Sequence, residues 1–451
     1  MQVISTEVSH ILQNASWIRR MFEAGIELKQ KHGADKVCDF TLGNPDLPPV
    51  PEVGRTLRRL ADTVDQPLSL GYMPNAGLTT TRQRLAQYLA EEQQVPLTAQ
   101  QVIVTCGAAG GLNVVFRTVL EPGDEVICPS PYFVEYGFYV GNFGGKLVPV
   151  PSKPSTFALD LDAIEAAITD RTRAVLIDSP NNPTGVVYNR AELEALAALL
   201  TRASQERRSP DRHNKEGQSG DWRSRPIYLI SDEPYRFLAY DGVEVPPILP
   251  LYPFSVAVGS FSKSLSLAGE RIGYIAVSPS MPMADPFIAG LILCNRILGY
   301  VNAPVIGQRL VEAALGATVD VGIYKSRRDA MATVLRDAGI EFALPKGAFY
   351  FFPKVPGPSR GEGVPPLRVA GILPAIRGQD ALDTKEQGQD GLATMDDVRF
   401  CQLLQEELVL AVPGRGFGLP GYFRLTYCMD EAIIRRAAPG FQKAAARARS
   451  R

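Results

Sequence analysis

A lysine and an arginine, eight residues apart, are the side chains of this sequence best suited to chemistry. Lys263 follows the apolar run 255–259, lies between small hydroxyl residues, and is followed by Arg271. A lysine that loses solvent has a lowered pKa and can act as a nucleophile that forms a Schiff base with a carbonyl. Ser260, Ser262 and Arg271 are suited to holding an anion such as a phosphate. A lone lysine after a strand is usually a surface residue, so the rest of the chain decides.

Further candidate groups follow other apolar runs. Small residues after the run 101–105 begin a predicted helix, whose first N–H groups can bind phosphate. An aromatic residue after 125–128 can stack on a planar ring, and the turn after 174–177 can present an amide. An aspartate after 227–230 needs a cationic partner, which a protonated pyridine nitrogen supplies, and a tyrosine three residues on can reach a phenolate oxygen. Taken singly, each is explained at least as easily by packing or capping. These residues are Ala108 and Ala109, Phe133, Asn182, and Asp232 with Tyr235.

The elements that must position these groups are predicted to form an α/β fold. Between residues 101 and 278, β-branched apolar runs alternate with helical patterns, of which 111–120 and 192–200 are clear examples. The second helix has a capping-box pattern formed by Asn189 and Glu192. Strands buried on both faces, with helices between them, favour a mostly parallel sheet sandwiched by helices. The expected strands are 101–105, 125–128, 146–149, 174–177, 227–230, 256–259 and 271–277.

The candidate groups all fall where predicted strands end. In an open α/β sheet the ligand site lies beyond the carboxyl ends of the strands. Each group there is suited to a different part of one molecule: a carbonyl, a phosphate, a planar ring and a pyridine nitrogen. Because independent coincidence at all these positions is improbable, the pattern predicts a site for pyridoxal 5′-phosphate.

The two ends of the chain are predicted to form a smaller α+β domain. Residues 1–32 and 287–338 have helical patterns, and short strands are expected at 349–353 and 422–427. Helices are expected between residues 430 and 447, broken at Pro439-Gly440. The N-terminal helix has an apolar stripe of Ile18, Met21, Phe22 and Ile26. We therefore expect 1–45 to join the small domain, 46–296 to form the large cofactor-binding domain, and 297–451 to form the small C-terminal domain.

Two polar stretches, 204–225 and 357–394, interrupt this pattern. Loops of this length inside a domain are usually surface insertions or functional lids, and we expect surface insertions. The second contains a short local repeat and an apolar segment, 367–376, that could dock elsewhere on the protein.

Composition excludes several classes of protein. The net charge of −1, from 47 basic and 48 acidic residues, gives no electrostatic footprint for nucleic acid or an anionic membrane. Six scattered cysteines without a CxxC pair indicate buried free thiols in a reducing compartment, and three distant histidines argue against a metal site. No secretory signal or membrane span is expected, so we expect a cytoplasmic location.

Together these motifs resemble the class I/II aminotransferases, which are fold-type I pyridoxal-phosphate enzymes similar to aspartate aminotransferase. The resemblance covers nearly the whole chain apart from the two insertions. It rests on Gly107-Ala108-Ala109, Asn182-Pro183-Thr184-Gly185, Asp232 with Tyr235, and residues 260–273 around Lys263. It extends to Leu42-Gly43-Asn44-Pro45-Asp46, Gly71-Tyr72, Val412-Pro413-Gly414 and Tyr422-Phe423-Arg424-Leu425.

The resemblance implies a role for each position around the cofactor. Lys263 would form the Schiff base with it and later move a proton. Asp232 would pair with the pyridinium nitrogen, and Asn182 and Tyr235 would hydrogen-bond the phenolic oxygen. Phe133, rather than Tyr132, would stack on the ring. The phosphate would be bound by the backbone of Ala108 and Ala109 with Ser260, Ser262 and Arg271.

The resemblance also implies contacts to the substrate and to a second subunit. Arg424 would bind the substrate α-carboxylate as a bidentate pair, helped by Gly43 and Asn182. Tyr72 would reach the phosphate of the neighbouring subunit, which implies a homodimer with shared active sites. A cation for a second substrate carboxylate is not assigned; Arg19, Arg20 and Arg296 are candidates, although a solvated helix face explains the first two better.

The expected reaction is transamination from an L-amino acid to a 2-oxo acid by a ping-pong mechanism. We expect an aspartate-aminotransferase-like activity with 2-oxoglutarate as the acceptor. A lyase of the same fold, performing β-elimination or cyclisation, stays open. A non-catalytic regulator is expected to carry a DNA-binding domain, and none precedes Gly43; a degenerate binding protein is disfavoured by intact Lys263, Asp232 and Arg424.

Overall fold

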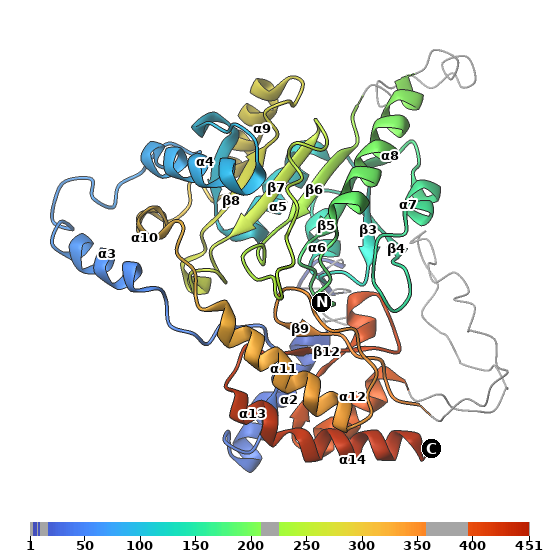
Figure 1. Ribbon diagram of the computed structural model, residues 1–451. Helices are drawn as coiled ribbons and strands as arrows, with labels where there is room; N and C mark the ends of the chain where they lie inside the picture. Colours follow the sequence, from blue (N-terminus) through green and yellow to red (C-terminus); the bar gives the residue numbers. More distant parts are fainter. Residues whose placement is uncertain (1–2, 7, 10–16, 209–224, 358–395, 451) are drawn as a thin grey trace.

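The centre of the structure is a seven-stranded sheet, seen in the computed structural model in Figure 1. The strand order is β2-β8-β7-β6-β5-β3-β4. Strand β8 pairs antiparallel with both of its neighbours, and the other pairs of this sheet are parallel. The predicted α/β fold with a mostly parallel sheet is therefore confirmed. The strands are β2 (Val102–Thr105), β3 (Glu125–Ser130), β4 (Lys146–Pro151), β5 (Thr172–Asp178), β6 (Tyr228–Asp232), β7 (Ser255–Ser260) and β8 (Gly273–Val277).

The structure describes residues 3–6, 8–9, 17–208, 225–357 and 396–450, without the side chains of residues 17–22. The expected insertions therefore fall largely outside the described residues, including the apolar segment 367–376. None of the helices in these ranges is long and apolar enough to cross a membrane.

Alternate residues of the strands enter two separate hydrophobic cores, one on each face of the sheet. In β5, Val175 and Ile177 belong to one cluster, whereas Leu176 between them belongs to the other. This period of two is what a strand buried on both faces requires. One face is covered by α4 (Thr79–Gln93), α7 (Leu161–Ala167) and α8 (Arg190–Arg208). The other is covered by α5 (Gly107–Val119), α6 (Tyr136–Gly141) and α9 (Ala284–Ile297).

Helix α8 begins with the predicted capping box. The Asn189 side chain accepts a hydrogen bond from the Glu192 backbone N–H at 3.0 Å, and Glu192 accepts one from the Asn189 N–H at 2.8 Å. The helix continues to Arg208, so the expectation that residues 204–208 belong to an insertion is wrong. Glutamine, glutamate and arginine in this stretch are good helix formers, which allows the helix to continue.

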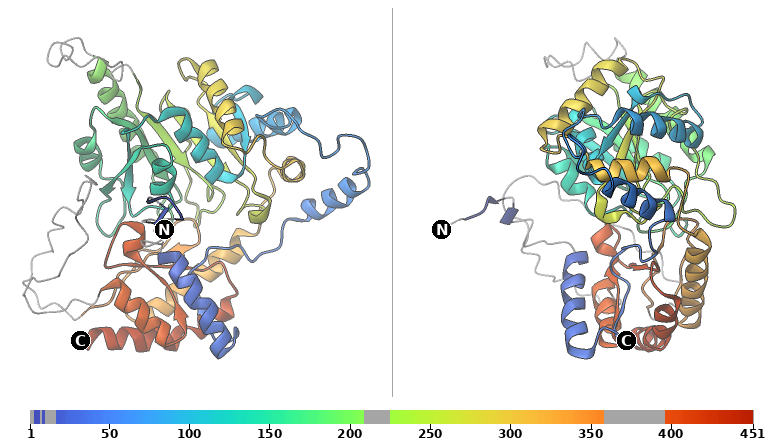
Figure 2. Two further views of the ribbon diagram at one scale, coloured as in Figure 1. Left: turned by 180° about the vertical axis from the view of Figure 1, so that it is seen from behind. Right: turned by 90° about the vertical axis from the view of Figure 1, so that its left-hand side faces the viewer.

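A second layer is built from both ends of the chain. Strand β1 (Cys38–Asp39) pairs in parallel with β10 (Val409–Leu410), which brings the N-terminal segment to the C-terminal part. Strands β9 (Tyr350–Phe351), β11 (Val412–Pro413) and β12 (Phe423–Thr426) form a small antiparallel sheet. Figure 2 shows α2 (Trp17–His32) beside the C-terminal helices. The remaining helices of this layer are α11 (Val321–Asp337), α12 (Asp397–Glu406), α13 (Glu431–Arg436) and α14 (Ala438–Arg449).

Two sequence expectations about the chain ends need correction. The break in the last helical region lies at Ala437, because Pro439 occupies the first turn of α14, where a missing N–H costs nothing. In α2, the Ile26 side chain of the expected apolar stripe is 44% exposed. The rest of this chain therefore does not bury it fully. The other three stripe residues have side chains outside the described part of the structure.

Two further helices connect the layers. Helix α3 (Pro51–Ala61) and α10 (Val305–Ala314) pack against each other, and α10 also packs against α4. With α9 and α11, α10 confirms the largely helical pattern expected for residues 287–338.

Candidate active site

Lys263 lies directly after β7, at the carboxyl edge of the sheet. Its Nζ donates a hydrogen bond to the Gly43 carbonyl at 2.8 Å and lies 5.5 Å from the centroid of the Phe349 ring. Burial lowers the pKa of Lys263 to about 8, and the positive charges of Arg271 and Arg424 act in the same direction. An appreciable fraction of this amine is therefore neutral near physiological pH, as a nucleophile requires.

Asp232 ends β6 and is fully enclosed. The Tyr136 hydroxyl donates a hydrogen bond to its Oδ2 at 2.8 Å, while Oδ1 is buried and has no hydrogen-bond partner among the described residues. Burial raises the pKa of Asp232 to about 7. A buried carboxylate with an unused oxygen needs a cationic donor, and a protonated pyridine nitrogen fits that need.

The first turn of α5 forms a place for a phosphate. Gly107 has φ of +71°, and a Cβ added there would lie 2.8 Å from the guanidinium of Arg271. A Cβ on Gly273 would lie 2.7 Å from the backbone nitrogen of Ala108, so this helix end, strand β8 and Arg271 meet closely. Arg271 is exposed and forms no ion pair with a described carboxylate. A helix N-terminus beside an unpaired guanidinium is suited to an anion. Ala109 lies in the same turn, Ser260 ends β7, and Ser262 follows it.

Arg424 of β12 is a buried cation held by neutral groups. It donates hydrogen bonds to the Asn182 side chain at 3.2 Å and to the Thr41 carbonyl at 2.5 Å. Its guanidinium lies 4.7 Å from the ring centroids of both Tyr350 and Phe417, and its Nε is buried without a partner in the described chain. Burial lowers the pKa of Arg424, as expected for a buried cation that has no counter-ion in the described chain. A substrate carboxylate can supply that counter-ion.

Tyr235 and Gly43 complete the group between the lysine and the arginine. The hydroxyls of Tyr235 and Tyr350 are hydrogen-bonded at 2.9 Å, and burial raises the pKa of Tyr235, so it stays a neutral donor. A side chain at Gly43 would collide with the Tyr350 hydroxyl and approach Phe349. Position 43 must therefore be glycine for its carbonyl to reach Lys263.

The two aromatic residues after β3 point to different parts of the protein. The Phe133 ring packs edge-on against Tyr136, the hydrogen-bond donor of Asp232, with 5.5 Å between centroids. Tyr132 instead lies next to Gly418, where an added Cβ would come within 2.7 Å of its ring. This geometry supports Phe133 as the residue that stacks on a cofactor ring.

Some predicted residues are not part of this group. Tyr72 is 93% exposed in the segment between α3 and α4, and Arg296 is exposed on α9. The side chains of Arg19 and Arg20 lie outside the described residues.

The structure adds contacts that the sequence did not reveal. Tyr136 and Tyr350 reach the site from α6 and β9, and Thr41 contributes a backbone carbonyl, so these depend on long-range packing. Asp178 ends β5 as the register partner of Asp232. Asp178 directly follows the predicted strand 174–177, so the signal that identifies Asp232 was present in the sequence for Asp178 as well.

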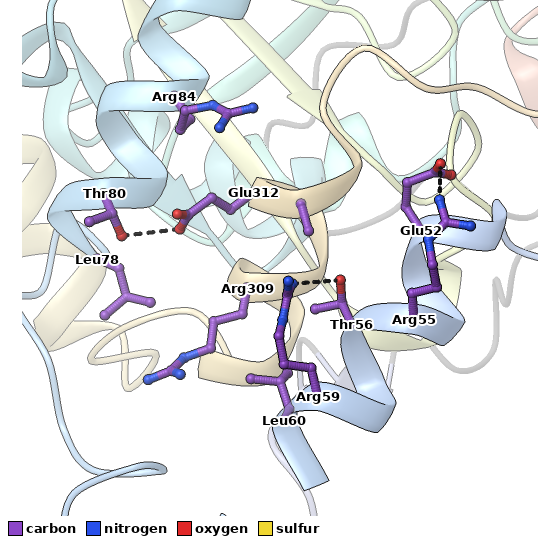
Figure 3. Close-up of a pocket in the computed structure, with 11 residues that line it drawn as sticks. Glu52, Arg55, Thr56, Arg59, Leu60, Leu78, Thr80, Arg84, Arg309 and Glu312 are labelled. Atoms are coloured by element: carbon purple, nitrogen blue, oxygen red, sulfur yellow. Dashed lines mark hydrogen bonds and ion pairs between the residues drawn. The ribbon is translucent and has the colours of Figure 1, made fainter. Parts of the chain in front are cut away.

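A separate cavity of about 770 Å³ lies between α3, α4 and α10 (Figure 3). Glu52 is paired with Arg55 at 2.5 Å, and Glu312 accepts a hydrogen bond from Thr80 at 3.1 Å. Arg309 donates to the carbonyl of Ser69, which places the cavity beside the exposed segment that carries Tyr72. None of the site residues above lines it. The arginines of its wall are Arg55, Arg59, Arg84 and Arg309.

The cysteines match the sequence expectation. All six are free; five are buried, and Cys106 is half-buried. Within the described ranges, no group of three or more His, Cys, Asp or Glu side chains is placed to hold a metal ion.

Comparison with known proteins identifies the family. The model of aminotransferase class I and II matches residues 35–204 and 222–441, so the chain belongs to this family. The aspartate aminotransferase of Thermotoga maritima is 31% identical over 403 residues, which are 88% of each chain. The aspartate/prephenate aminotransferase of Thermus thermophilus is 30% identical over 432 residues, covering 94% of each chain.

Solved structures agree in fold. An amino transferase from Eubacterium rectale superposes with a TM-score of 0.83 at 33% identity, covering 99% of this chain and 100% of that one. The Thermus thermophilus aspartate aminotransferase with maleate gives 0.75 at 27% identity, covering 98% and 100%. The protein is therefore an enzyme, a pyridoxal-phosphate-dependent aminotransferase, as the motifs predicted.

Proposed function

We propose that this aminotransferase acts on a dicarboxylic amino acid, in the manner of aspartate aminotransferase, with 2-oxoglutarate as the acceptor. The observation that carries the binding of an amino acid is Arg424, a buried guanidinium without a carboxylate partner in the described chain, bonded to Asn182 and close enough to Lys263 to affect its pKa. Amino acids and 2-oxo acids share the α-carboxylate that such a cation binds. The aspartate aminotransferases among the relatives support the choice of substrate.

Each residue of the site has a separate role. When bound, pyridoxal phosphate supplies an electron sink for the carbanion left by removal of the α-proton. Lys263, with its lowered pKa, takes that proton and returns it. Asp232 holds the ring nitrogen, while Asn182 and Tyr235 hold the phenolic oxygen. Arg424, with Gly43, fixes the substrate carboxylate and so orients the Cα–H bond toward the lysine.

The other roles extend to the two ends of the cofactor. The ring would stack on Phe133. The phosphate would be bound by the backbone of Ala108 and Ala109, by Ser260, Ser262 and Arg271, and by Tyr72 of a second subunit.

A panel of amino acids tests this proposal. Purified protein is mixed with each amino acid, and loss of the visible absorbance of the lysine-bound cofactor is followed with time. We expect L-aspartate and L-glutamate to react at least about tenfold faster than L-alanine or L-phenylalanine, and 2-oxoglutarate to restore the absorbance. Faster reaction of L-phenylalanine would contradict the dicarboxylate preference. L-Serine and L-cysteine, which carry a leaving group on Cβ, are added to the panel, and release of pyruvate and ammonia from either would establish the lyase alternative instead.

Two variants control this panel. Lys263→Ala should lose the visible absorbance, whereas Lys443→Ala, which changes an exposed lysine on α14, should keep it. An unchanged spectrum in the first variant would contradict the assignment of Lys263.

We also infer a homodimer with shared active sites and a cytoplasmic location. Tyr72 and Leu68, 93% and 88% exposed, form with Leu70 an apolar surface between α3 and α4 beside the cavity of Figure 3. Such a surface is suited to a second copy of the chain. Six free cysteines fit a reducing compartment.

A further inference from the structure

We propose that Asp178 is a positioning residue of this active site, which remains protonated next to Asp232, confines the negative charge of the pair to Asp232, and fixes Asn182. The proposal rests on the cofactor roles assigned above. Asp178 acts through these two residues rather than on the substrate.

The pairing of β5 with β6 makes the two aspartates neighbours. Asp178 is the last residue of β5 and Asp232 the last residue of β6, and they are register partners in a parallel pair. Register partners place their side chains on the same face of a sheet. Their exposed fractions are 4% and 6%, and Oδ1 of each is buried without a hydrogen-bond partner among the described residues.

The second oxygen of each aspartate is fixed. Asp178 Oδ2 accepts a hydrogen bond from the backbone N–H of Asn182 at 2.9 Å, and Asp232 Oδ2 accepts one from Tyr136 at 2.8 Å. The Asn182 side chain in turn accepts one from Arg424 at 3.2 Å. A continuous set of contacts thus links the carboxyl pair to the arginine expected to bind substrate.

Charge decides the protonation of the pair. Two adjacent buried carboxyls cannot both ionise cheaply, so the pair retains at least one proton. Burial, with the charge of Asp232, raises the pKa of Asp178 well above its usual value, whereas that of Asp232 is raised to about 7. Asp232 therefore ionises first. One pyridinium brings one positive charge, which balances Asp232 and leaves Asp178 neutral.

The other groups around Asp178 do not supply a second cation. Those with an electrostatic interaction with it are Cys128 of β3, Tyr136 of α6, Tyr188 after β5, Asp232 of β6, Tyr235 after β6, and Tyr350 of β9. All of these groups are acids, and Glu233, which acts on Asp232, is itself ion-paired with Arg236 at 3.4 Å. Arg424 is bonded to the Asn182 side chain and is not among the groups that act on the pKa of Asp178.

Cofactor affinity of three variants tests the charge state. Protein stripped of cofactor is titrated with pyridoxal phosphate at neutral pH, and visible absorbance gives the dissociation constant. Asp178→Asn keeps a neutral group that can still accept from Asn182, so its dissociation constant should stay within about threefold of wild type. Asp178→Ala removes the anchor of Asn182 and should weaken binding about tenfold or more. Asp232→Asn removes the counter-ion and should weaken it further. Equal weakening in Asp178→Asn and Asp232→Asn would overturn the proposal, because Asp178 would then be ionised.

Unfolding of the cofactor-free protein gives a second readout. A carboxyl whose pKa is raised by folding contributes stability at low pH that is lost as the pH rises from its unfolded toward its folded pKa. Asparagine does not titrate, so Asp178→Asn does not lose this stability. The melting temperature of Asp178→Asn minus that of wild type should therefore increase as the pH rises from about 4 to about 8. A purely structural role would shift the melting temperature equally at every pH, and that result would overturn the proposal. Asp170→Asn, an exposed control, should show no such dependence.

The two experiments separate this proposal from the cofactor assignment. If Asp232→Asn binds pyridoxal phosphate as wild type does, the assignment of Asp232 fails. If Asp232→Asn loses affinity but the pH dependence of Asp178→Asn matches wild type, only the role of Asp178 fails.

Discussion

Burial around Lys263 determines when its amine can react. Folding lowers its pKa to about 8, so the amine is increasingly neutral as the pH rises to that value and largely neutral above it. The rate at which cofactor-free protein captures pyridoxal phosphate should therefore increase up to about pH 8 and then level off. Stopped-flow absorbance measures this rate.

The outcome depends on the enclosure of the lysine by Gly43 and Phe349. A rate that continues to rise past about pH 10, the range of an ordinary lysine, would show that the amine is solvated. The exposed-lysine variant Lys443→Ala should reproduce the wild-type profile.

Residues that follow strands were predictable, and residues that arrive by packing were not. Lys263, Asp232 and Asn182 were predictable because each lies a few residues after an apolar run in the sequence. Tyr350 and Tyr136 enter the site from a distant strand and a short helix, and local pattern carries no information about such contacts.

At the scale of elements, the start of β8 holds the first turn of α5 in place. A Cβ on Gly273 would lie 2.5 Å from the carbonyl carbon of Gly107 and 2.6 Å from the Gly259 oxygen, both backbone atoms that cannot move aside easily. Gly273→Ala should therefore destabilise the protein by about 1–3 kcal/mol. It should also weaken cofactor binding, because the helix end is displaced. Denaturant unfolding and absorbance titration measure the two effects.

A matched control lies four residues earlier. An added Cβ on Gly269 meets no atom within 4 Å, so Gly269→Ala should be close to neutral in both measurements. Similar losses of stability and cofactor binding in the two variants would show that neither property depends on the contact between β8 and α5.

Elements with a clear period were predicted well. The seven strands of the sheet were all anticipated, because apolar runs buried on both faces leave a strong pattern. Boundaries were less certain: α8 continues through a polar stretch, and the last helices part at Ala437 rather than at the proline. Both differences arise because helix ends depend on capping and first-turn geometry more than on composition.

For the whole molecule, Tyr72 provides the test of a shared site. A dimer is prepared with Lys263→Ala in one subunit and Tyr72→Ala in the other, using different affinity tags. If Tyr72 serves the neighbouring site, one site carries both substitutions and the other carries none. Activity should then be about half that of the wild-type dimer. If Tyr72 serves its own subunit, no intact site exists, and activity should be about half that of the Tyr72→Ala homodimer.

The domain boundaries at residues 45 and 296 stay predictions. Helix α9 packs on the face of the large sheet through α5. After residue 296, α10 packs against α4 of the large layer, whereas α11 packs against α13 and α14 of the small layer. The segment after 296 therefore contacts both layers. Sequence patterns identify the elements on each side of such a connection, but they do not determine where one layer ends.

The contacts of residues 41–43 have a consequence for biosynthesis. Thr41 and Gly43 hold Arg424 and Lys263, and this segment is positioned by the pairing of β1 with β10, whose residues are far apart in the sequence. A nascent chain cannot form that pair until Val409 and Leu410 have left the ribosome. The catalytic pocket is therefore completed only after the strands of the central sheet, which all precede β10, have been synthesised.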